Sequence, residues 1–383
     1  GITIVPEIEM PGHSLAALSC YPHLSCTGGP FEIFPFFHGP NKPDDLYCAG
    51  NEETFTFLEG VLDEVMDIFP SEYIHIGGDE APKSKWKACS KCQQRIRDEG
   101  LTDEEALQAW FVERIGKYLE KKGRKLIGWD EVLEGGIGPD TAVMSWRGIE
   151  GGLKGARGGH SVVMSPYTHT YLDFTPLQTP IRKMYLYEPV PEALDRNQAE
   201  MILGIQGNHW SHLDRRPDRV DTMIYPRLLA IAERGWVPKD RRDWTDFEAR
   251  LAAHKRDLDA FGITRWEPPA GEWSAEELNS GPVAREFDIT GKIDRPGCFE
   301  VFFRPKAWSG VKTQVNGVDL LAGGQIVSSD NHRGIIGWDW SEPDYLLNLP
   351  EYTAGTTYVL RVRLEGTERK EGAGEIYFRR CTN

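Results

Sequence analysis

Short apolar segments alternate with longer amphipathic ones over roughly the first two thirds of the chain. The apolar segments have the length of β-strands and lie at residues 2–6, 73–77, 124–128, 141–146, 161–165 and 201–205. Between most of them, apolar residues recur every three or four positions, which is the period of a helix with one buried face. These amphipathic stretches are residues 52–69, 103–122, 222–235 and 243–261. Because apolar strands that alternate with helices form a parallel sheet covered on both faces, this region is predicted to be an α/β domain.

Two parallel architectures fit this alternation, a doubly wound sheet and a barrel. Polar and aromatic residues follow the carboxyl ends of nearly all the predicted strands. In a (β/α)8 barrel of the TIM type these ends converge on one pocket, whereas in an open sheet only the strands at the switch point contribute. We therefore expect residues 1–266 to form a partial (β/α)8 barrel whose first strands are missing from this chain.

The chain begins directly with one of the apolar segments. Ile-Thr-Ile-Val-Pro at residues 2–6 is predicted to be a buried strand, and neither an initiating Met nor a signal peptide precedes it. We therefore expect further sequence upstream of Gly1, and a targeting signal would lie there.

The pattern changes near residue 267, where Glu-Pro-Pro-Ala-Gly at 267–271 has the composition of a linker. Beyond it, short segments with alternating apolar positions are separated by turn residues such as Asn316-Gly317. These segments lie at 284–289, 298–303, 311–315, 357–364 and 374–379. The pattern predicts an all-β sandwich over residues 275–383, either a packing module or a sugar-binding one that uses Trp308, Trp338 or Trp340.

Charge and composition exclude some partners. The net charge is −15, which argues against nucleic acid, because phosphate binding requires clustered Lys and Arg. No apolar run approaches the roughly 20 residues of a membrane-spanning helix. The 12 Trp residues hint at carbohydrate, since the indole packs flat against a sugar face.

The seven cysteines do not predict a disulfide framework, because their number is odd and their spacing irregular. Cys89 and Cys92 form a lone C-x-x-C, and no second pair with finger-like spacing follows, so we expect no metal and no cofactor. Cys26 and Cys48 flank a Gly/Pro-rich loop and could form a disulfide in an oxidising compartment.

The chemistry-bearing residues follow the predicted strands in order. They are Glu7, Glu9 and His13, then Asp79 and Glu80, then Trp129, Asp130 and Glu131, then Trp146 and Arg147, then Tyr171 and Asp173, and finally Trp210 and His212. The two glycines before Asp79 allow a tight bend, beyond which both neighbouring carboxylates can face one pocket. The alternative is that Asp79 and Glu80 cap a helix that contains Pro82 in its first turn. Three tryptophans at strand ends favour the pocket, since a glycosidase needs an acid with a raised pKa and a stabilising partner among aromatic walls.

With these strand ends the chain resembles glycoside hydrolase family 20, the β-N-acetylhexosaminidases. The similarity spans most of residues 1–265 and leaves the predicted sandwich uncovered. Its most specific element is His-Ile-Gly-Gly-Asp-Glu at residues 75–80. The matching segments are Val5–Ser14, Tyr73–Glu80, Gly128–Glu131, Ser145–Gly148, Tyr171–Asp173, Gln206–Trp210 and Pro226–Trp236.

The resemblance implies a retaining enzyme that removes terminal N-acetylhexosamine from glycans, using the substrate's acetamide as nucleophile, outside the cytoplasm and without a cofactor. It implies that Glu80 is the general acid/base, that Asp79 orients the acetamide, and that Tyr171 hydrogen-bonds the acetamide oxygen. The remaining expected site residues are Trp129, Trp146 and Trp210 around the sugar, Asp173 near its outer hydroxyls, and His13 supporting the carboxylates.

Two departures from the family pattern leave alternatives open. His212 stands where relatives often carry Glu, so it binds either a neutral hydroxyl or an anionic sugar such as 6-O-sulfated N-acetylglucosamine. The Arg that grips the sugar from the first barrel strand has no counterpart in this chain. A catalytically impaired sugar-binding protein, or a glycosidase that pairs Glu131 with a second carboxylate about 5 Å away, are the other readings.

Overall fold

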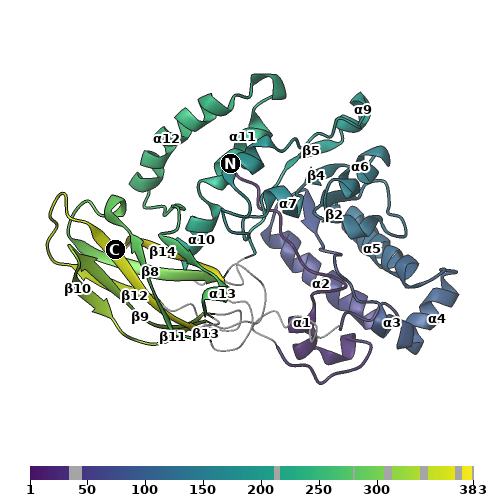
Figure 1. Cartoon of the computed structure of the whole chain (residues 1–383). Helices are drawn as coiled ribbons and strands as arrows, with labels where there is room; N and C mark the ends of the chain where they lie inside the picture. Colours follow the sequence, from purple (N-terminus) through teal and green to yellow (C-terminus); the bar gives the residue numbers. More distant parts are fainter. Residues whose placement is uncertain are drawn as a thin grey trace. The chain divides into compact units, whose positions relative to one another are not determined.

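The computed structural model describes residues 1–33, 45–210, 216–278, 281–305, 313–336, 344–366 and 373–381. The chain divides into two compact units, Gly1–Trp266 and Glu267–Asn383, the first rich in helices and the second built mainly of strands (Figure 1). In the part of the chain covered by these ranges, we find no helix with the length and hydropathy that crossing a bilayer requires.

The first unit is built around a parallel sheet. Its strands follow one another in the order β1-β2-β3-β4-β5, and each pairs in parallel with the next. The strands are β1 (Tyr73–His75), β2 (Lys125–Trp129), β3 (Ala142–Ser145), β4 (Val162–Met164) and β5 (Ile202–Ile205). The predicted α/β domain with a parallel sheet is confirmed, and the sequential order lacks the reversal that defines a doubly wound sheet.

The predicted buried strand at residues 2–6 is wrong. Ile2 and Ile4 are 95% and 63% exposed, and pairing with β1 begins only at Pro6, whose carbonyl accepts the His75 N–H at 2.9 Å. The backbone of Glu7 then forms an isolated parallel β-bridge with His75. Among the described residues nothing covers the side chains of residues 2–5, so their apolar character does not lead to burial.

Three of the predicted helices form as expected. They are α2 (Glu52–Ile68), α5 (Glu104–Lys121) and α12 (Trp244–Ala260), and the side chains of Asn51, Asp103 and Asp243 cap their N-termini. The predicted helix at 222–235 is instead two helices, α10 (Pro217–Ile224) and α11 (Arg227–Trp236). Pro226 separates them, because proline has no N–H to donate and its ring obstructs the preceding turn.

The other helices of this unit are shorter. They are α1 (Leu15–Cys20), α3 (Ser84–Ala88), α4 (Ser90–Asp98), α6 (Glu150–Arg157), α7 (Tyr167–Thr170), α8 (Ile181–Leu186) and α9 (Arg196–Ala199). Helices α5, α6 and α11 contact β2, β3 and β5 respectively, so the apolar strands are buried as an α/β sheet requires. The shared core includes Ile74, Leu126 and Val143 from the strands and Phe55 and Phe111 from the helices.

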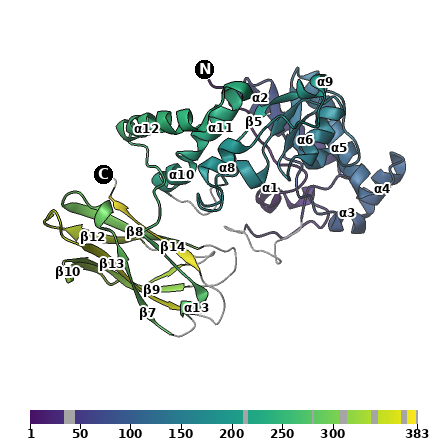
Figure 2. The same cartoon turned by 45° about the horizontal axis from the view of Figure 1, so that its top comes forward.

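The second unit contains two antiparallel sheets, which Figure 2 shows together with the short helix α13 (Ala275–Leu278). One has the order β10-β9-β13-β7, with β11 also paired to β9, and the other has the order β12-β8-β14-β6. The strands are β6 (Gly271–Trp273), β7 (Val283–Asp288), β8 (Gly297–Pro305), β9 (Thr313–Ala322), β10 (Gln325–Asp330), β11 (Gly334–Ile336), β12 (Tyr345–Leu349), β13 (Tyr358–Gly366) and β14 (Gly374–Arg380). Residues of both sheets, such as Phe303 and Leu360, share one hydrophobic core, as in a β-sandwich.

Asn316-Gly317, predicted to be a turn, lies inside β9. Val315 pairs with Leu364 and Gly317 with Arg363, so Asn316 is the extra residue of a β-bulge. Gly317 has φ +130°, a conformation that side-chain-bearing residues rarely adopt. The same residue pair that favours a hairpin turn therefore serves a bulge here. Trp308, Trp338 and Trp340 lie outside the described residues.

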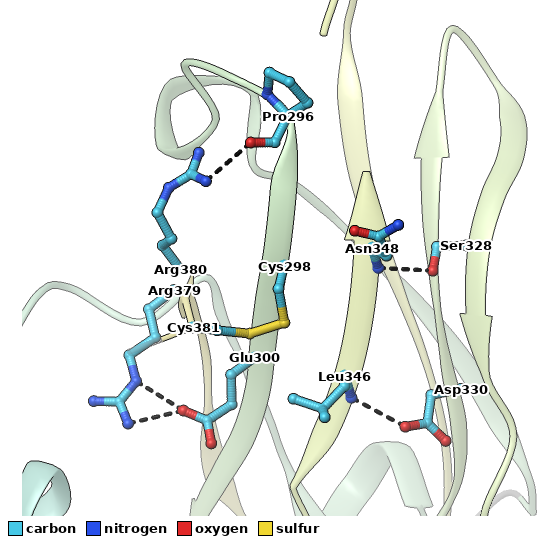
Figure 3. Close-up of a disulfide and its surroundings, with 10 residues drawn as sticks. All are labelled: Pro296, Cys298, Glu300, Ser328, Asp330, Leu346, Asn348, Arg379, Arg380 and Cys381. Carbon is cyan, nitrogen blue, oxygen red and sulfur yellow. Dashed lines mark hydrogen bonds and ion pairs between the residues drawn. A yellow bond between two sulfur atoms is a disulfide. The ribbon is translucent and has the colours of Figure 1, made fainter. Parts of the chain in front are cut away.

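A disulfide between Cys298 and Cys381 joins the start of β8 to the residue after β14 (Figure 3). The sequence did not predict it, because the two cysteines are 83 residues apart and only the pairing of β8 with β14 brings them together. The same figure shows Arg379 paired with Glu300 across these strands at 2.8 Å. Cys26 and Cys48 are both free thiols, so the disulfide considered for them is not present.

The figure also shows how side chains of β10 approach β12. The Leu346 N–H donates to an Asp330 carboxylate oxygen at 3.0 Å, and the Asn348 N–H donates to the Ser328 hydroxyl at 3.0 Å. These bonds satisfy donors on the edge of one sheet with side chains of the other, so they tie the two sheets together.

Candidate active site

The candidate site lies where the parallel strands end, and two glycines shape its centre. Gly77 and Gly78 follow β1 with φ +70° and +91°. A methyl group at Gly77 would collide with the Glu9 carboxylate, and one at Gly78 would meet Val132 at 2.8 Å. Only glycine fits both the backbone angles and the space, so the chain bends sharply just before Asp79 and Glu80.

One imidazole contacts both carboxylates of the motif. Nε2 of His13 lies 3.3 Å from Oδ2 of Asp79 and 3.3 Å from Oε2 of Glu80. The Asp79 side chain is 16% exposed and the Glu80 side chain 51% exposed. The two neighbouring carboxylates therefore occupy different environments, one largely enclosed and one open to solvent.

The alternative that these carboxylates cap a helix is wrong. Helix α3 begins at Ser84, its N-cap residue is Lys83, and no side chain caps it. Asp79 and Glu80 precede that helix by several residues and point toward His13 instead. The local pattern of acidic residues before Pro82 is thus explained by the site, not by helix capping.

Aromatic rings lie at or just after the ends of the four further strands β2 to β5. Trp129 is buried and donates its indole N–H to Oε1 of Glu7 at 2.9 Å. Its ring lies 6.0 Å from that of Trp210, which is 41% exposed. The Trp146 ring stacks on Tyr171 at 6.4 Å. The rings together form a partly exposed aromatic wall, the kind of surface on which a sugar face packs.

Tyr171 connects the aromatic wall to the carboxylates. Tyr171 is buried, and its backbone forms an isolated parallel β-bridge with Asn208. Desolvation raises the pKa of its phenol well above the ordinary value, hydrogen bonds with Trp210 and Asn208 lower it, and the charges of Asp173 and Asp79 raise it. The phenol therefore keeps its proton at neutral pH and can donate a hydrogen bond within the electrostatic reach of Asp79.

The predicted residues that the structure describes thus form one connected group. Contacts or charge interactions join His13, Asp79, Glu80, Tyr171, Asp173, Trp129, Trp146 and Trp210. His212 lies outside the described residues. No role was assigned from the sequence to Glu9 or His75, which also border this group.

Glu9 is a half-buried acid whose pKa is raised. Desolvation raises its pKa to about 10, and the charge of Asp79 and a hydrogen bond with Glu7 raise it as well. At neutral pH the Glu9 carboxyl is neutral and Glu7 accepts its proton as a hydrogen bond. The Glu-x-Glu spacing gave a signal for this pair, because alternate residues of an extended segment share a face.

His75 is a neutral imidazole beneath the site. Its Nδ1 accepts the Gly77 N–H at 3.0 Å, which assigns the proton to the other ring nitrogen. Burial lowers the pKa of His75, so the 3.3 Å approach to Glu7 is not an ion pair at neutral pH. The bond to Gly77 instead fixes the bend that precedes Asp79.

A buried acidic turn positions the Trp146 indole. Oδ1 of Asp130 accepts Nε of Arg147 at 2.6 Å, and Oδ2 accepts the Trp146 backbone N–H at 3.1 Å. The Trp146 indole donates to Glu131 at 2.9 Å, while burial raises the pKa of the Glu131 carboxyl to about 7. Because Trp146 is held at both its backbone and its ring, its stacking on Tyr171 is fixed.

Two groups of described residues have the donor atoms to hold a metal ion. One is His13, Asp79 and Glu80, whose oxygen and nitrogen atoms already contact one another. The other consists of four cysteines: Cys26, Cys48, Cys89 and Cys92. Spacing did not reveal this second group, because the chain reaches Cys26 and Cys48 long before the Cys89–Cys92 pair.

Similarity to known proteins identifies the family to which this chain is related. Residues 1–239 match the model of the catalytic domain of glycosyl hydrolase family 20. A β-hexosaminidase of Porphyromonas gingivalis is 45% identical over 275 residues, which cover 68% of this chain and 35% of that protein. A β-hexosaminidase of Vibrio furnissii is 36% identical over 249 residues, covering 61% of this chain and 40% of that one.

Solved structures give the same result. The exo-β-N-acetylglucosaminidase of Vibrio harveyi, solved with N-acetylglucosamine, superposes with a TM-score of 0.62 at 34% identity, covering 70% of this chain and 44% of that one. The chain therefore spans less than half the length of each of these proteins. It belongs to glycosyl hydrolase family 20, and its residues 1–239 correspond to the catalytic domain of that family.

Proposed function

We propose that the protein is a retaining exo-β-N-acetylhexosaminidase, which removes terminal β-linked N-acetylglucosamine or N-acetylgalactosamine from glycans. Membership of family 20 and the named activities of the relatives support this proposal. The observation that carries it is the pair of neighbouring carboxylates on one imidazole, with Asp79 enclosed and Glu80 open to solvent. Two such environments separate the two acids into different chemical roles.

In the proposed mechanism the substrate's acetamide is the nucleophile. Oδ1 of Asp79 is buried and has no hydrogen-bond partner in the described part of the chain, so it suits an acetamide N–H. The protonated phenol of Tyr171 donates to the acetamide oxygen, which attacks the anomeric carbon to give an oxazolinium ion. Glu80 protonates the departing oxygen and then takes a proton from the water that opens the ring, so the configuration is retained.

The proposal includes a partial (β/α)8 barrel in the first unit and a location outside the cytoplasm. The sequential parallel order of β1 to β5 supports the barrel, because barrel strands follow one another around the axis. The Cys298–Cys381 disulfide supports secretion or periplasmic export, since disulfides persist in oxidising compartments.

The test compares two substrates with different leaving groups. Glu80→Gln should lower kcat/KM for an unactivated N-acetylglucosamine disaccharide by about two to four orders of magnitude, and much less for an activated aryl glycoside, which needs little protonation. Asp79→Asn should impair both substrates, because the acetamide acts in either case. Each substitution is made in the complete gene product.

Glu120→Gln is the matched control. Glu120 is exposed near the end of α5, which leads into the start of β2 and so lies away from the carboxyl ends. Near-normal hydrolysis of the disaccharide by Glu80→Gln, or an α-anomer as the first product, would contradict the mechanism. Sugar binding without hydrolysis by the unaltered protein would establish a sugar-binding protein instead.

A further inference from the structure

Four cysteine sulfurs gather in the first unit, outside the candidate active site. All lie within 4.8 Å of one another, with Sγ–Sγ distances of 3.6 Å for Cys26–Cys92, 3.6 Å for Cys48–Cys92 and 3.8 Å for Cys48–Cys89. A tetrahedron of sulfurs about 2.3 Å from a central zinc ion has edges of about 3.8 Å. The cluster therefore has the dimensions of a four-cysteine metal site.

The distances do not fit a pair of disulfides. Each sulfur of a disulfide has one close partner, about 2.05 Å away. Here Cys92 approaches Cys26 and Cys48 at the same 3.6 Å, and Cys48 approaches Cys89 as well. None of the four is disulfide-bonded. Sulfurs that share neighbours in this way surround a common centre.

Three segments with their own hydrogen bonds deliver the sulfurs. Cys26 follows a short 3-10 turn, Pro22–Leu24, and the Cys48 N–H donates to the carbonyl of Leu24 at 2.8 Å. Cys89 is the N-cap residue of α4, and Cys92 lies in its first turn, where it is fully buried. The C-x-x-C pair at a helix start and the two upstream cysteines thus meet through the fold, not through regular spacing.

Gly50 allows the two halves of the cluster to touch. A methyl group there would collide with the backbone of Lys91, between the two cysteines of α4. A residue with a side chain at position 50 would therefore force apart the two segments that carry Cys48 and the Cys89–Cys92 pair.

We propose that Cys26, Cys48, Cys89 and Cys92 bind one zinc ion in a structural site. Each thiol loses its proton and forms one Zn–S bond, with no change of oxidation state. All four positions of the ion are filled by protein, so it takes no part in hydrolysis. The site goes beyond the proposed glycosidase activity, which assigns no metal.

The proposed ion braces the segments that carry the catalytic candidates. Tyr47, next to Cys48, donates its N–H to the carbonyl of Pro11 at 3.0 Å, two residues before His13. The carbonyl of Tyr47 accepts the Trp86 indole N–H at 2.9 Å, just beyond Asp79 and Glu80 in the chain. The cluster thus links the loop of His13 to the segment that follows the carboxylate pair.

Metal content of the protein as its gene encodes it tests the proposal directly. After expression with zinc and removal of loosely bound metal, plasma mass spectrometry should find about one zinc per chain, and X-ray absorption should show four sulfurs at about 2.3 Å. Cys89→Ser/Cys92→Ser should lose the zinc. Cys20→Ser is the matched control, because Cys20 is an exposed free cysteine outside the cluster, and it should retain the zinc.

Alkylation of the unaltered protein decides the question even if the double variant does not fold. The four cysteines should resist alkylation until a chelator removes the zinc. Thiols that react freely without chelation, disulfides among the four, or iron in place of zinc would each overturn the assignment. These readouts do not involve hydrolysis, so a failed glycosidase assay would leave this inference standing, and the reverse also holds.

Discussion

His13 and Glu80 hold backbone angles that side-chain-bearing residues usually avoid, with φ +47° and +44°. Such conformations cost about 1–3 kcal/mol each and persist where the surroundings enforce them. Here the two residues meet at one contact, Nε2 to Oε2, at 3.3 Å. The strained backbone of these two residues costs stability but positions their side chains beside the enclosed carboxylate of Asp79. Strain of this kind is often found at functional sites.

Glu131 gives a prediction about pH. Burial raises the pKa of this carboxyl from 4.5 to about 7, and only 10% of the side chain is exposed. Below pH 4.5 the carboxyl is protonated in both the folded and the unfolded chain. Between pH 4.5 and 7 the unfolded chain releases the proton while the folded chain keeps it, so the free energy of unfolding falls as pH rises, by about 3 kcal/mol in total.

Glu131→Gln cannot ionise, yet its amide oxygen can still accept the Trp146 indole N–H. Relative to the unaltered protein, its free energy of unfolding should therefore rise by up to about 3 kcal/mol between pH 4.5 and 8. Urea unfolding at several pH values measures this difference, with Glu120→Gln as the surface control. A difference that stays constant with pH would show that Glu131 ionises normally.

The role of an individual residue was predictable from the sequence where neighbouring residues define it. The Gly-Gly-Asp-Glu run shows its bend and its acids within four adjacent positions. Glu9 and His75 were not assigned roles, because their protonation depends on burial that only the folded chain defines. The four clustered cysteines were missed for the same reason, since the fold supplies their proximity.

Among the secondary-structure elements, amphipathic helices were the most predictable. Helices α2, α5 and α12 each carry a continuous apolar face and a capping side chain, so their signal is contained within the helix itself. Residues 2–5 are apolar but exposed, because strand burial depends on neighbours that the segment does not encode. Strands β6, β10, β11 and β12 were missed. The partners of β6, β11 and β12 are distant in sequence, whereas β10 follows its partner β9 directly but is largely exposed and so carries no alternating apolar pattern.

The bulge in β9 gives a prediction at this scale. A methyl group at Gly317 would meet the Asp330 carbonyl at 2.8 Å and collide with the Arg363 guanidinium, in addition to the strain of φ +130°. Gly317→Ala should therefore lower the free energy of unfolding of the second unit by about 3 kcal/mol. Chemical denaturation followed by a signal from this unit measures the loss.

Asn316→Ala is the matched neighbour. It removes one hydrogen bond, from the Asn316 amide to Glu365 at 3.1 Å, and should cost about 1 kcal/mol or less. Equal losses for the two variants would mean that the bulge does not require glycine.

For the whole molecule, the structural class of each of the two units was predictable from the sequence, whereas the disulfide and the four-cysteine cluster were not. The period of the apolar pattern distinguishes parallel α/β structure from antiparallel strands without any tertiary information. The disulfide and the sulfur cluster join residues far apart in the chain. Their positions follow from strand pairing and loop packing, which short-range patterns do not specify.

The two cross-links predict separate responses in the two units. A zinc chelator should raise hydrogen exchange in peptides near Cys26, Cys48 and the start of α4, and leave the sandwich unchanged. A reductant should raise exchange near Cys298 and Cys381 and leave the first unit unchanged. Exchange measured by mass spectrometry tests both, and a response of both units to either reagent would contradict the separation.

The sulfur sites also impose an order on the maturation of the protein. The disulfide of the second unit forms only where an oxidant is present, yet the same oxidant can link the four close thiols of the first unit into unwanted pairs. If these thiols bind zinc, the metal must arrive before the oxidant, because a metal-bound thiolate is shielded from exchange. The chain would then have to pass first through an environment that supplies zinc and only afterwards through one that oxidises thiols.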